Sequence, residues 1–247
     1  IIHALAGGNI IPENLSTCDD TAVIARAFKD NPYEIDIMAA GTAMRFMTAY
    51  LSVTEGEHVL TGTERMKQRP IKILVDALRF LGADIQYTGE EGFPPLLIKG
   101  KKLKGGSVEV AGNVSSQYVS ALLMIGPTLE KGLELKLLGN VISRPYIDLT
   151  LNLMHEYGAD AEWTDVDTIT IRPKRYEERS YTIENDWTAA SYWYAILTLL
   201  NDRKSYIRFP GLKNGSRQGD SAAKYIFSLL GVKTTFADKE MDELTDV

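Results

Sequence analysis

The sequence A-G-T-A-M-R-F at Ala40–Phe46 is followed by an apolar run and then by T-G-T-E-R-M-K-Q-R-P at Thr61–Pro70. The first segment predicts that Gly41 and Thr42 open a helix. The first N–H groups of a helix have no partner within the helix, so they suit an anion. The segment therefore indicates an anion site at this helix start.

Arginine side chains lie at both ends of the same region. Arg45 follows Gly41 by about one helical turn. Arg69 closes the later loop, and Pro70 is of a type favoured at the first position of a helix. Two guanidinium groups around a helix start are suited to a carboxylate or a phosphate. We therefore predict an enzyme that handles small anionic metabolites.

These features recur along the chain. Helix starts with glycine or hydroxyl residues are spaced by 74 and then 73 positions, at Gly41-Thr42, Ser115-Ser116 and Thr188-Ala189. Glycines that end an amphipathic helix and precede an expected strand are spaced by 76 and then 73 positions, at Gly82, Gly158 and Gly231. This self-similarity indicates an internal repeat.

The periodicity of apolar residues orders the elements within each repeat. Helices are predicted at Met44–Leu51, Ile71–Phe80, Tyr118–Leu129 and Tyr146–Tyr157. Strands are predicted at Glu57–Leu60, Asp84–Tyr87, Leu96–Lys99, Ser107–Val110, Leu133–Leu138, Asp160–Trp163 and Thr168–Arg172. Each unit then runs β-α-β-α-β-β, which makes the fold class α/β. Around a pseudo-symmetry axis, the helix starts and the loops that end in Arg69-Pro70 and Arg144-Pro145 would approach one another.

Each motif also has a purely structural explanation. Gly41-Thr42 and Ser115-Ser116 fit ordinary helix caps, and Arg69 and Arg144 fit solvated loop charges. The recurrence of both features at the same place in successive repeats favours function. Gln117, which both donates and accepts hydrogen bonds, would let the triplet Ser115-Ser116-Gln117 grip a phosphate and a hydroxyl.

Composition narrows the class of protein. The 247 residues are 45% hydrophobic and 24% charged, as in a globular protein of one or two domains. The net charge of -6 offers no basic excess for nucleic acid or an anionic membrane. No apolar run approaches the roughly 20 residues of a membrane-spanning helix. The single cysteine, Cys18, cannot form an internal disulfide, so we expect a cytoplasmic protein.

Other candidate groups favour structural roles. The three histidines, His3, His58 and His155, lack metal-ligand spacing, so we expect no metal site. Cys18 precedes Asp19-Asp20 at an expected helix start and is interpreted as a packed cysteine. The aromatic cluster is expected to be core or interface; it comprises Trp187, Tyr192, Trp193 and Tyr194.

The two ends of the sequence indicate a portion of a longer protein. Ile1–Leu5 followed by Gly7-Gly8 resembles the tail of a helix with its glycine stop. Residues 237–247 form an acidic, turn-like segment with no predicted element after it. The alternative is a complete small domain with frayed ends.

Five motifs in order resemble the EPSP synthase (3-phosphoshikimate 1-carboxyvinyltransferase) family. They are A-G-T-A-M-R, R-M-K-Q-R-P-I, V-S-S-Q-Y, S-R-P-Y-I-D-L-T-L-N-L-M and G-S-R-Q-G-D, and the likeness runs from Asn14 to Asp220. The resemblance implies an enolpyruvyl transferase-like inside-out α/β barrel with a pseudo-threefold repeat of β-α-β-α-β-β units. It places a first domain at residues 1–183 and the incomplete start of a second at residues 184–247.

The implied reaction moves the enolpyruvyl group of phosphoenolpyruvate to the 5-hydroxyl of shikimate 3-phosphate and releases phosphate, in the shikimate pathway. No metal or organic cofactor is implied, and we expect a monomer. Shikimate 3-phosphate would be held by Ser115, Ser116, Gln117, Ser143 and Tyr146. Phosphoenolpyruvate would be held by Gly41, Thr42, Arg45, Arg69 and Gln117.

The chain departs from the family pattern in two ways. The family often has Asn and Pro where Ala39 and Phe46 stand here, and a bulky Phe46 bears on the pocket that would bind the inhibitor glyphosate. The family's catalytic Asp and Glu would follow Val247, so no catalytic residue is expected within this chain. We accordingly expect this chain alone to bind weakly and not to turn over.

Two alternatives stay open. One is the related enolpyruvyl transferase that acts on UDP-N-acetylglucosamine, which expects a reactive cysteine in a loop where Thr61–Pro70 has none. The other is a non-catalytic binding protein that keeps the repeat. Replacing Arg69 would separate an enzyme from such a protein, because a scaffold has no activity to lose.

Overall fold

The computed structural model describes residues 1–8, 11–202 and 204–236. Its contacts divide the chain into two compact units, Ile1–Thr182 and Ile183–Val247. That these units are a first domain and the start of a second domain of a longer protein stays a prediction. The acidic segment at residues 237–247 lies outside the described residues.

The first unit begins with two helices and then forms a four-stranded sheet. Helices α1 (Ile2–Leu5) and α2 (Asp19–Asp30) precede it. The elements that follow are β1 (Glu34–Asp36), α3 (Gly41–Val53), β2 (Gly56–Thr61), α4 (Glu64–Lys67), α5 (Lys72–Phe80), β3 (Asp84–Tyr87) and β4 (Leu96–Gly100). The strand order is β1-β2-β4-β3; β1 and β2 are parallel and the other pairs are antiparallel.

A second sheet repeats this pattern. Its elements are β5 (Gly106–Ala111), α6 (Ser116–Ile125), a 3₁₀ turn (Gly126–Thr128), β6 (Leu133–Leu138), α7 (Arg144–Glu156), β7 (Ala161–Trp163) and β8 (Thr168–Ile171). The order β5-β6-β8-β7 again has one parallel pair, β5 with β6. The predicted α/β class and the β-α-β-α-β-β unit are confirmed. The element bounds lie within three residues of the prediction, except that α6 ends four residues before the predicted Leu129.

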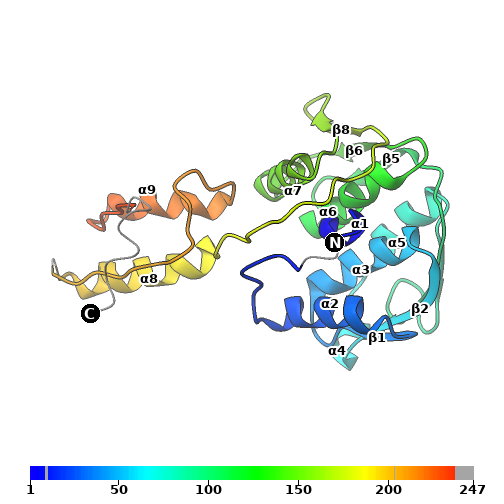
Figure 1. The fold of residues 1–247 in the computed structure, drawn as a ribbon, viewed down its shortest axis with the longest axis horizontal. Coiled ribbons are helices and arrows are strands. Elements are labelled where there is room, and N and C mark those ends of the chain that lie inside the picture. Colours follow the sequence, from blue (N-terminus) through cyan, green and yellow to red (C-terminus); the bar gives the residue numbers. More distant parts are fainter. Residues whose placement is uncertain (9–10, 203, 237–247) are drawn as a thin grey trace. The chain divides into compact units, whose positions relative to one another are not determined.

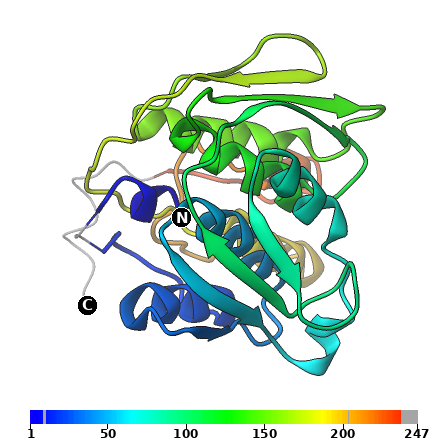
Figure 2. The ribbon, with the colours of Figure 1, turned by 90° about the vertical axis from the view of Figure 1, so that its right-hand side faces the viewer.

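Helices α3 and α6 pack against each other in the interior of the first unit (Figures 1 and 2). Their sequences are apolar nearly all round, which is typical of a helix buried on every side. Every residue of α6 from Tyr118 onward is buried. This central pair brings the starts of the two helices to one place.

In the described part of the second unit, the regular elements are all helices. Helix α8 (Trp187–Leu200) starts one residue before the predicted Thr188, and a 3₁₀ turn (Gly219–Ala222) leads into α9 (Ala223–Ser228). Trp187 and Tyr194 are buried in its core, whereas Tyr192 and Trp193 are exposed, so the aromatic cluster is core only in part. The strand predicted after Gly231 is wrong, because residues 232–236 form none.

No helix in the described part of the chain is long and apolar enough to cross a membrane.

Candidate anion site at two helix starts

Both repeats place a helix start and a loop at the same edge of a sheet. Strands β1 and β2 are parallel, so the residues after β1, which open α3, and the loop after β2 leave the same edge. The start of α6 and the loop after β6 are related in the same way by the parallel pair β5 and β6. Such carboxyl edges are where ligands bind in open α/β sheets.

Gly41 lies where two arginines converge. A Cβ atom added to this residue would lie 2.4 Å from Nη1 of Arg69 and 2.9 Å from Nη1 of Arg45. The preceding residue, Ala40, offers no side chain to cap α3. The first N–H groups of α3 and two guanidinium groups are therefore close together, as the sequence predicted for an anion site.

Arg45 is a buried cation. It is 5% exposed, its Nη1 donates to the Gly41 carbonyl at 2.9 Å, and its Cζ lies 5.5 Å from the centre of the Tyr118 ring. Its buried Nε has no hydrogen-bond partner among the described residues. Burial of a charge is costly unless the charge is paired, so Arg45 favours an anion beside it.

Arg69 is positioned by a one-turn helix that the sequence treated as loop. Thr63 caps α4 by accepting a hydrogen bond from the Met66 N–H at 3.4 Å, and the Met66 side chain is buried. The N–H of Arg69 then donates to the Met66 carbonyl at 2.9 Å. Within the described residues no carboxylate lies within 4.0 Å of the Arg45 or Arg69 guanidinium.

The start of α6 carries the predicted triplet. Ser115 caps this helix by accepting a hydrogen bond from the Gln117 N–H at 3.3 Å, so its structural explanation holds. The Gln117 side-chain amide donates to the Thr42 hydroxyl at 3.0 Å. Gln117 thus joins the starts of α3 and α6, while Ser115 and Ser116 stay accessible to solvent.

Ser143 and Tyr146 begin α7. The loop after β6 is joined to the loop after β5 by a hydrogen bond from the Ile142 N–H to the Gly112 carbonyl at 3.4 Å. Ser143 is the N-cap of α7 with no side-chain cap bond in the described chain, and Tyr146 is 54% exposed. Both side chains are accessible near the second helix start, although no described hydrogen bond links them to Ser115 or Ser116.

Arg144 does not share the role of Arg69. Its Cζ lies 3.9 Å from the centre of the Trp163 ring, and its Nη1 donates to the Val166 carbonyl at 3.2 Å. The expectation that both Arg-Pro loops would turn toward the helix starts is wrong for this arginine. The aromatic partner on β7 takes the guanidinium, which the repeat register alone could not predict.

Tyr118 is a further residue of the site that the sequence analysis missed. It follows Gln117, is 7% exposed, and donates its hydroxyl to the Pro70 carbonyl at 2.6 Å. The sequence analysis treated it as one apolar position in a helix. The available signal was a phenol hydroxyl in the first turn of a mostly apolar helix.

Phe46 is accommodated within α3. Its side chain is half-buried and packs against the core, and the helix is continuous from Gly41 through Val53. Ala39 is exposed just before the helix. Ala39 and Phe46, where the sequence departs from the family pattern, therefore do not prevent the two arginines from lying close to Gly41.

The remaining candidates have structural partners. His58 contacts the Pro32 carbonyl, His3 contacts the Tyr157 hydroxyl, and His155 contacts the Ala161 carbonyl. The described residues contain no group of three or more side chains suited to a metal ion.

Cys18 is exposed, so its interpretation as a packed residue is wrong. It is the N-cap of α2, where hydrogen bonding to Ser16 and Thr21 lowers the pKa of its thiol. An N-cap residue precedes the helix rather than lying on its buried face, which is why the thiol reaches solvent.

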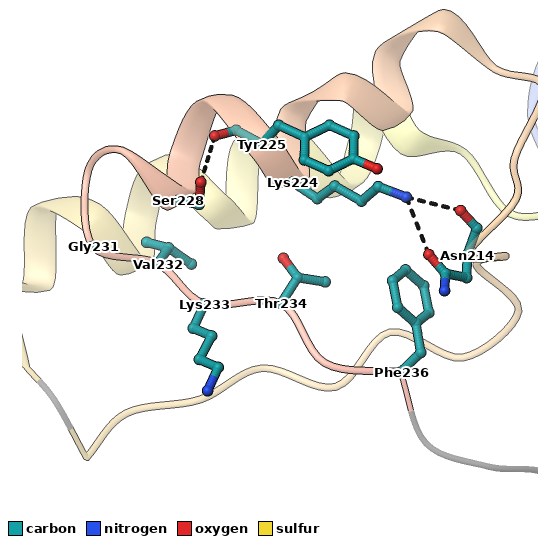
Figure 3. Close-up of a pocket in the computed structure, with 9 residues that line it drawn as sticks. All are labelled: Asn214, Lys224, Tyr225, Ser228, Gly231, Val232, Lys233, Thr234 and Phe236. Atoms are coloured by element: carbon teal, nitrogen blue, oxygen red, sulfur yellow. Dashed lines mark hydrogen bonds between the residues drawn. The ribbon is translucent and has the colours of Figure 1, made fainter.

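A hollow of about 420 Å³ lies within the second unit (Figure 3). The ammonium of the buried Lys224 donates to the Asn214 carbonyl at 2.8 Å and to its side-chain oxygen at 3.3 Å. It also lies 5.0–5.7 Å from the ring centres of Trp187, Tyr225 and Phe236. These contacts give Lys224 a structural role.

Another hollow, of about 580 Å³, lies between α5 and β5 in the first unit. Ile73 and Phe80 line it from α5. Neither hollow is lined by a residue predicted to bind substrate.

Comparison with known proteins identifies the family. The chain matches the family model described as EPSP synthase (3-phosphoshikimate 1-carboxyvinyltransferase) over residues 3–246. A Bacteroides fragilis protein (strain ATCC 25285) named 3-phosphoshikimate 1-carboxyvinyltransferase is 55% identical over 238 residues, covering 96% of this chain and 58% of that protein. A protein of the same name from Actinobacillus pleuropneumoniae serotype 3 is 37% identical over 249 residues, covering 96% of this chain and 57% of that one.

A solved structure shows the same fold. The EPSP synthase of Acinetobacter baumannii aligns with a TM-score of 0.65 and 22% identity, over 78% of this chain and 49% of that chain. The chain belongs to the EPSP synthase family and has its α/β fold. It spans somewhat more than half the length of the curated relatives, 58% of the Bacteroides protein.

Proposed function

We propose that the complete protein, as a member of the EPSP synthase family, transfers the enolpyruvyl group of phosphoenolpyruvate to the 5-hydroxyl of shikimate 3-phosphate and releases phosphate. One observation carries the proposal. The guanidinium groups of Arg45 and Arg69 converge on Gly41, and Gln117 joins that helix start to the serines of the next one. Two anionic substrates would lie side by side there.

Phosphoenolpyruvate would bind at the start of α3. Its carboxylate and phosphate would accept hydrogen bonds from Arg45, Arg69 and the free N–H groups of the helix, with Thr42 beside them. Hydrogen bonds to charged groups contribute about 1.5–3 kcal/mol each. The lack of a Cβ at Gly41 leaves room for both guanidinium groups.

Shikimate 3-phosphate would bind at the start of α6. Ser115, Ser116 and Ser143 would hold its phosphate, and the exposed ring of Tyr146 would border its ring. Gln117 would lie between the two substrates, since it already contacts Thr42 from the other helix start.

The chemistry is an addition followed by an elimination. The 5-hydroxyl would lose its proton to a base as its oxygen bonds to the central carbon of phosphoenolpyruvate, while an acid would protonate the methylene carbon and turn it into a methyl group. Loss of a proton from that carbon and of phosphate then restores the double bond. The donors around Gly41 would steady the charge on the departing phosphate, while the acid and base would come from elsewhere in the complete protein.

This chemistry requires neither a metal nor an organic cofactor, so the proposal includes none. Both substrates are phosphorylated small molecules, so we propose that the protein acts in the cytoplasm. We further propose that it acts as a monomer, because both predicted binding sets come from one chain.

The test is phosphate release by the complete protein from the two substrates. We expect turnover in the unmutated protein and at least about a hundredfold loss of kcat/KM in Arg69→Ala, as for removal of a donor to developing charge. Arg144→Ala is the matched control, because it removes the equivalent arginine of the next repeat, which stacks on Trp163 instead. Equal activity in all three proteins, or none in the unmutated one, would refute the proposal.

A further inference from the structure

Tyr118 contacts both arms of the anion site. Its hydroxyl donates to the Pro70 carbonyl at 2.6 Å, directly after Arg69 in the chain. Its ring lies beside Arg45, whose Cζ is 5.5 Å from the ring centre. The buried side chain of Tyr118 therefore contacts the loop that carries Arg69, and it also packs against the guanidinium of Arg45.

The hydroxyl and the ring of Tyr118 act on different arginines. The hydroxyl holds the end of the loop after α4, so it limits how far Arg69 can move from Gly41. The ring faces a guanidinium that is itself 5% exposed and whose Nε has no described partner. An aromatic ring attracts such a cation more strongly when water is excluded.

We propose that Tyr118 is a positioning residue for phosphoenolpyruvate: its hydroxyl holds the Arg69 loop and its ring orients Arg45. The inference rests on the proposed function, and it adds a residue that touches no substrate. Both guanidinium groups are then aimed at the anion before it binds, which lowers the cost of ordering them.

The chain offers a matched control in a second tyrosine that is hydrogen-bonded to the same helix. Tyr176 is also buried, and its hydroxyl donates to the Met124 carbonyl at 2.8 Å, at the other end of α6. Tyr176→Phe removes the same kind of hydrogen bond as Tyr118→Phe. The two variants differ chiefly in their distance from the anion site.

The first measurement is steady-state kinetics of the complete protein and its variants. We expect Tyr118→Phe to raise the KM for phosphoenolpyruvate by about three- to tenfold, in line with the loss of one hydrogen bond. The KM for shikimate 3-phosphate should change less than about twofold. Tyr118→Leu, which also removes the ring, should raise the phosphoenolpyruvate KM further, and Tyr176→Phe should leave both values unchanged.

The second measurement is amide hydrogen exchange over residues 61–74. The N–H of Arg69 is hydrogen-bonded to the Met66 carbonyl, so a loosened loop should exchange faster there. We expect faster exchange in Tyr118→Phe and no change in Tyr176→Phe. This readout does not depend on turnover.

Three results would overturn the inference: an unchanged phosphoenolpyruvate KM in Tyr118→Phe, an equal rise in both KM values, or unchanged exchange over the loop. Absence of phosphate release from the unmutated protein would instead refute the proposed function. The exchange data would then still decide whether Tyr118 holds the loop.

Discussion

At Gly41, two arginine side chains leave no room for a Cβ atom. The Nη1 atoms in the way belong to the flexible ends of Arg69 and Arg45, so a methyl group would displace them rather than the backbone. The position therefore matters for the direction of two charges more than for the fold. A side chain at this position should therefore affect anion binding more than stability.

Gly41→Ala in the complete protein should raise the KM for phosphoenolpyruvate by about tenfold, because hydrogen bonds to the charged substrate lengthen. The thermal midpoint should fall by less than about 2 °C, since only side-chain ends move. Gly215→Ala is the control, because a Cβ there would have no neighbour within 4 Å. An unchanged KM in Gly41→Ala would show that the two arginines do not serve this substrate.

The sequence predicted the positions of some side chains of the site but not of others. The approach of Arg69 to Gly41 was predictable, because both follow parallel strands of one repeat. The fate of Arg144 was not, since it depends on the ring of Trp163. Tyr118 was missed for a similar reason, because its hydroxyl partner is a backbone carbonyl that no motif records.

At the scale of one element, the start of α6 combines a cap with a proposed phosphate ligand. Ser115 accepts a hydrogen bond from the Gln117 N–H and also presents its hydroxyl to solvent. Alanine and glycine separate these roles, because glycine is a tolerable N-cap and alanine is not.

Ser115→Ala should lower the free energy of unfolding by about 1 kcal/mol, and Ser115→Gly by only a few tenths. Both variants lack the hydroxyl, so both should weaken shikimate 3-phosphate binding by a similar factor of about ten. Chemical unfolding and calorimetry measure the two effects. If affinity fell in proportion to stability instead, Ser115 would be a cap only.

In the second sheet, side chains of strand β6 alternate between the core and solvent. Leu135 is fully buried and pairs with Val108 and Ile169 on either side, whereas the neighbouring Lys136 faces solvent.

Leu135→Ala should lower the free energy of unfolding by about 2–5 kcal/mol. Lys136→Ala should change it by less than about 0.5 kcal/mol. Similar losses in urea unfolding would contradict the observed alternation.

Elements with strict alternation were the easiest to predict. The bounds of β3 and β6 agree with the sequence residue for residue, because each shows a clear period of two. The predicted strand after Gly231 is absent because a strand needs a partner, and the described residues of the second unit contain no strand.

At the scale of the whole molecule, burial of tyrosines on the first unit links its stability to pH. Burial raises the pKa of Tyr176 far above its ordinary value. The unfolded chain would ionise this phenol above about pH 10 while the folded protein keeps it neutral. The folded state then binds more protons, so stability falls as pH rises through that range.

Between about pH 9.5 and 11 the free energy of unfolding should therefore fall less steeply in Tyr176→Phe than in the unmutated protein, by up to about 1.4 kcal/mol per pH unit. Burial also raises the pKa of Tyr50 and Tyr157, but both are present in the two proteins and cancel in the comparison. Denaturant unfolding at a series of pH values measures the two slopes. Parallel slopes would contradict the burial of this phenol.

The central claim is that the two helix starts of this chain bind a small phosphorylated acceptor. Calorimetric titration of the complete protein with shikimate 3-phosphate, and separately with UDP-N-acetylglucosamine, tests it most directly. We predict saturable binding of shikimate 3-phosphate alone, lost when Ser115 and Ser116 are both replaced by alanine. Binding of the sugar nucleotide alone would contradict the account and assign the protein to the other class of enolpyruvyl transferase.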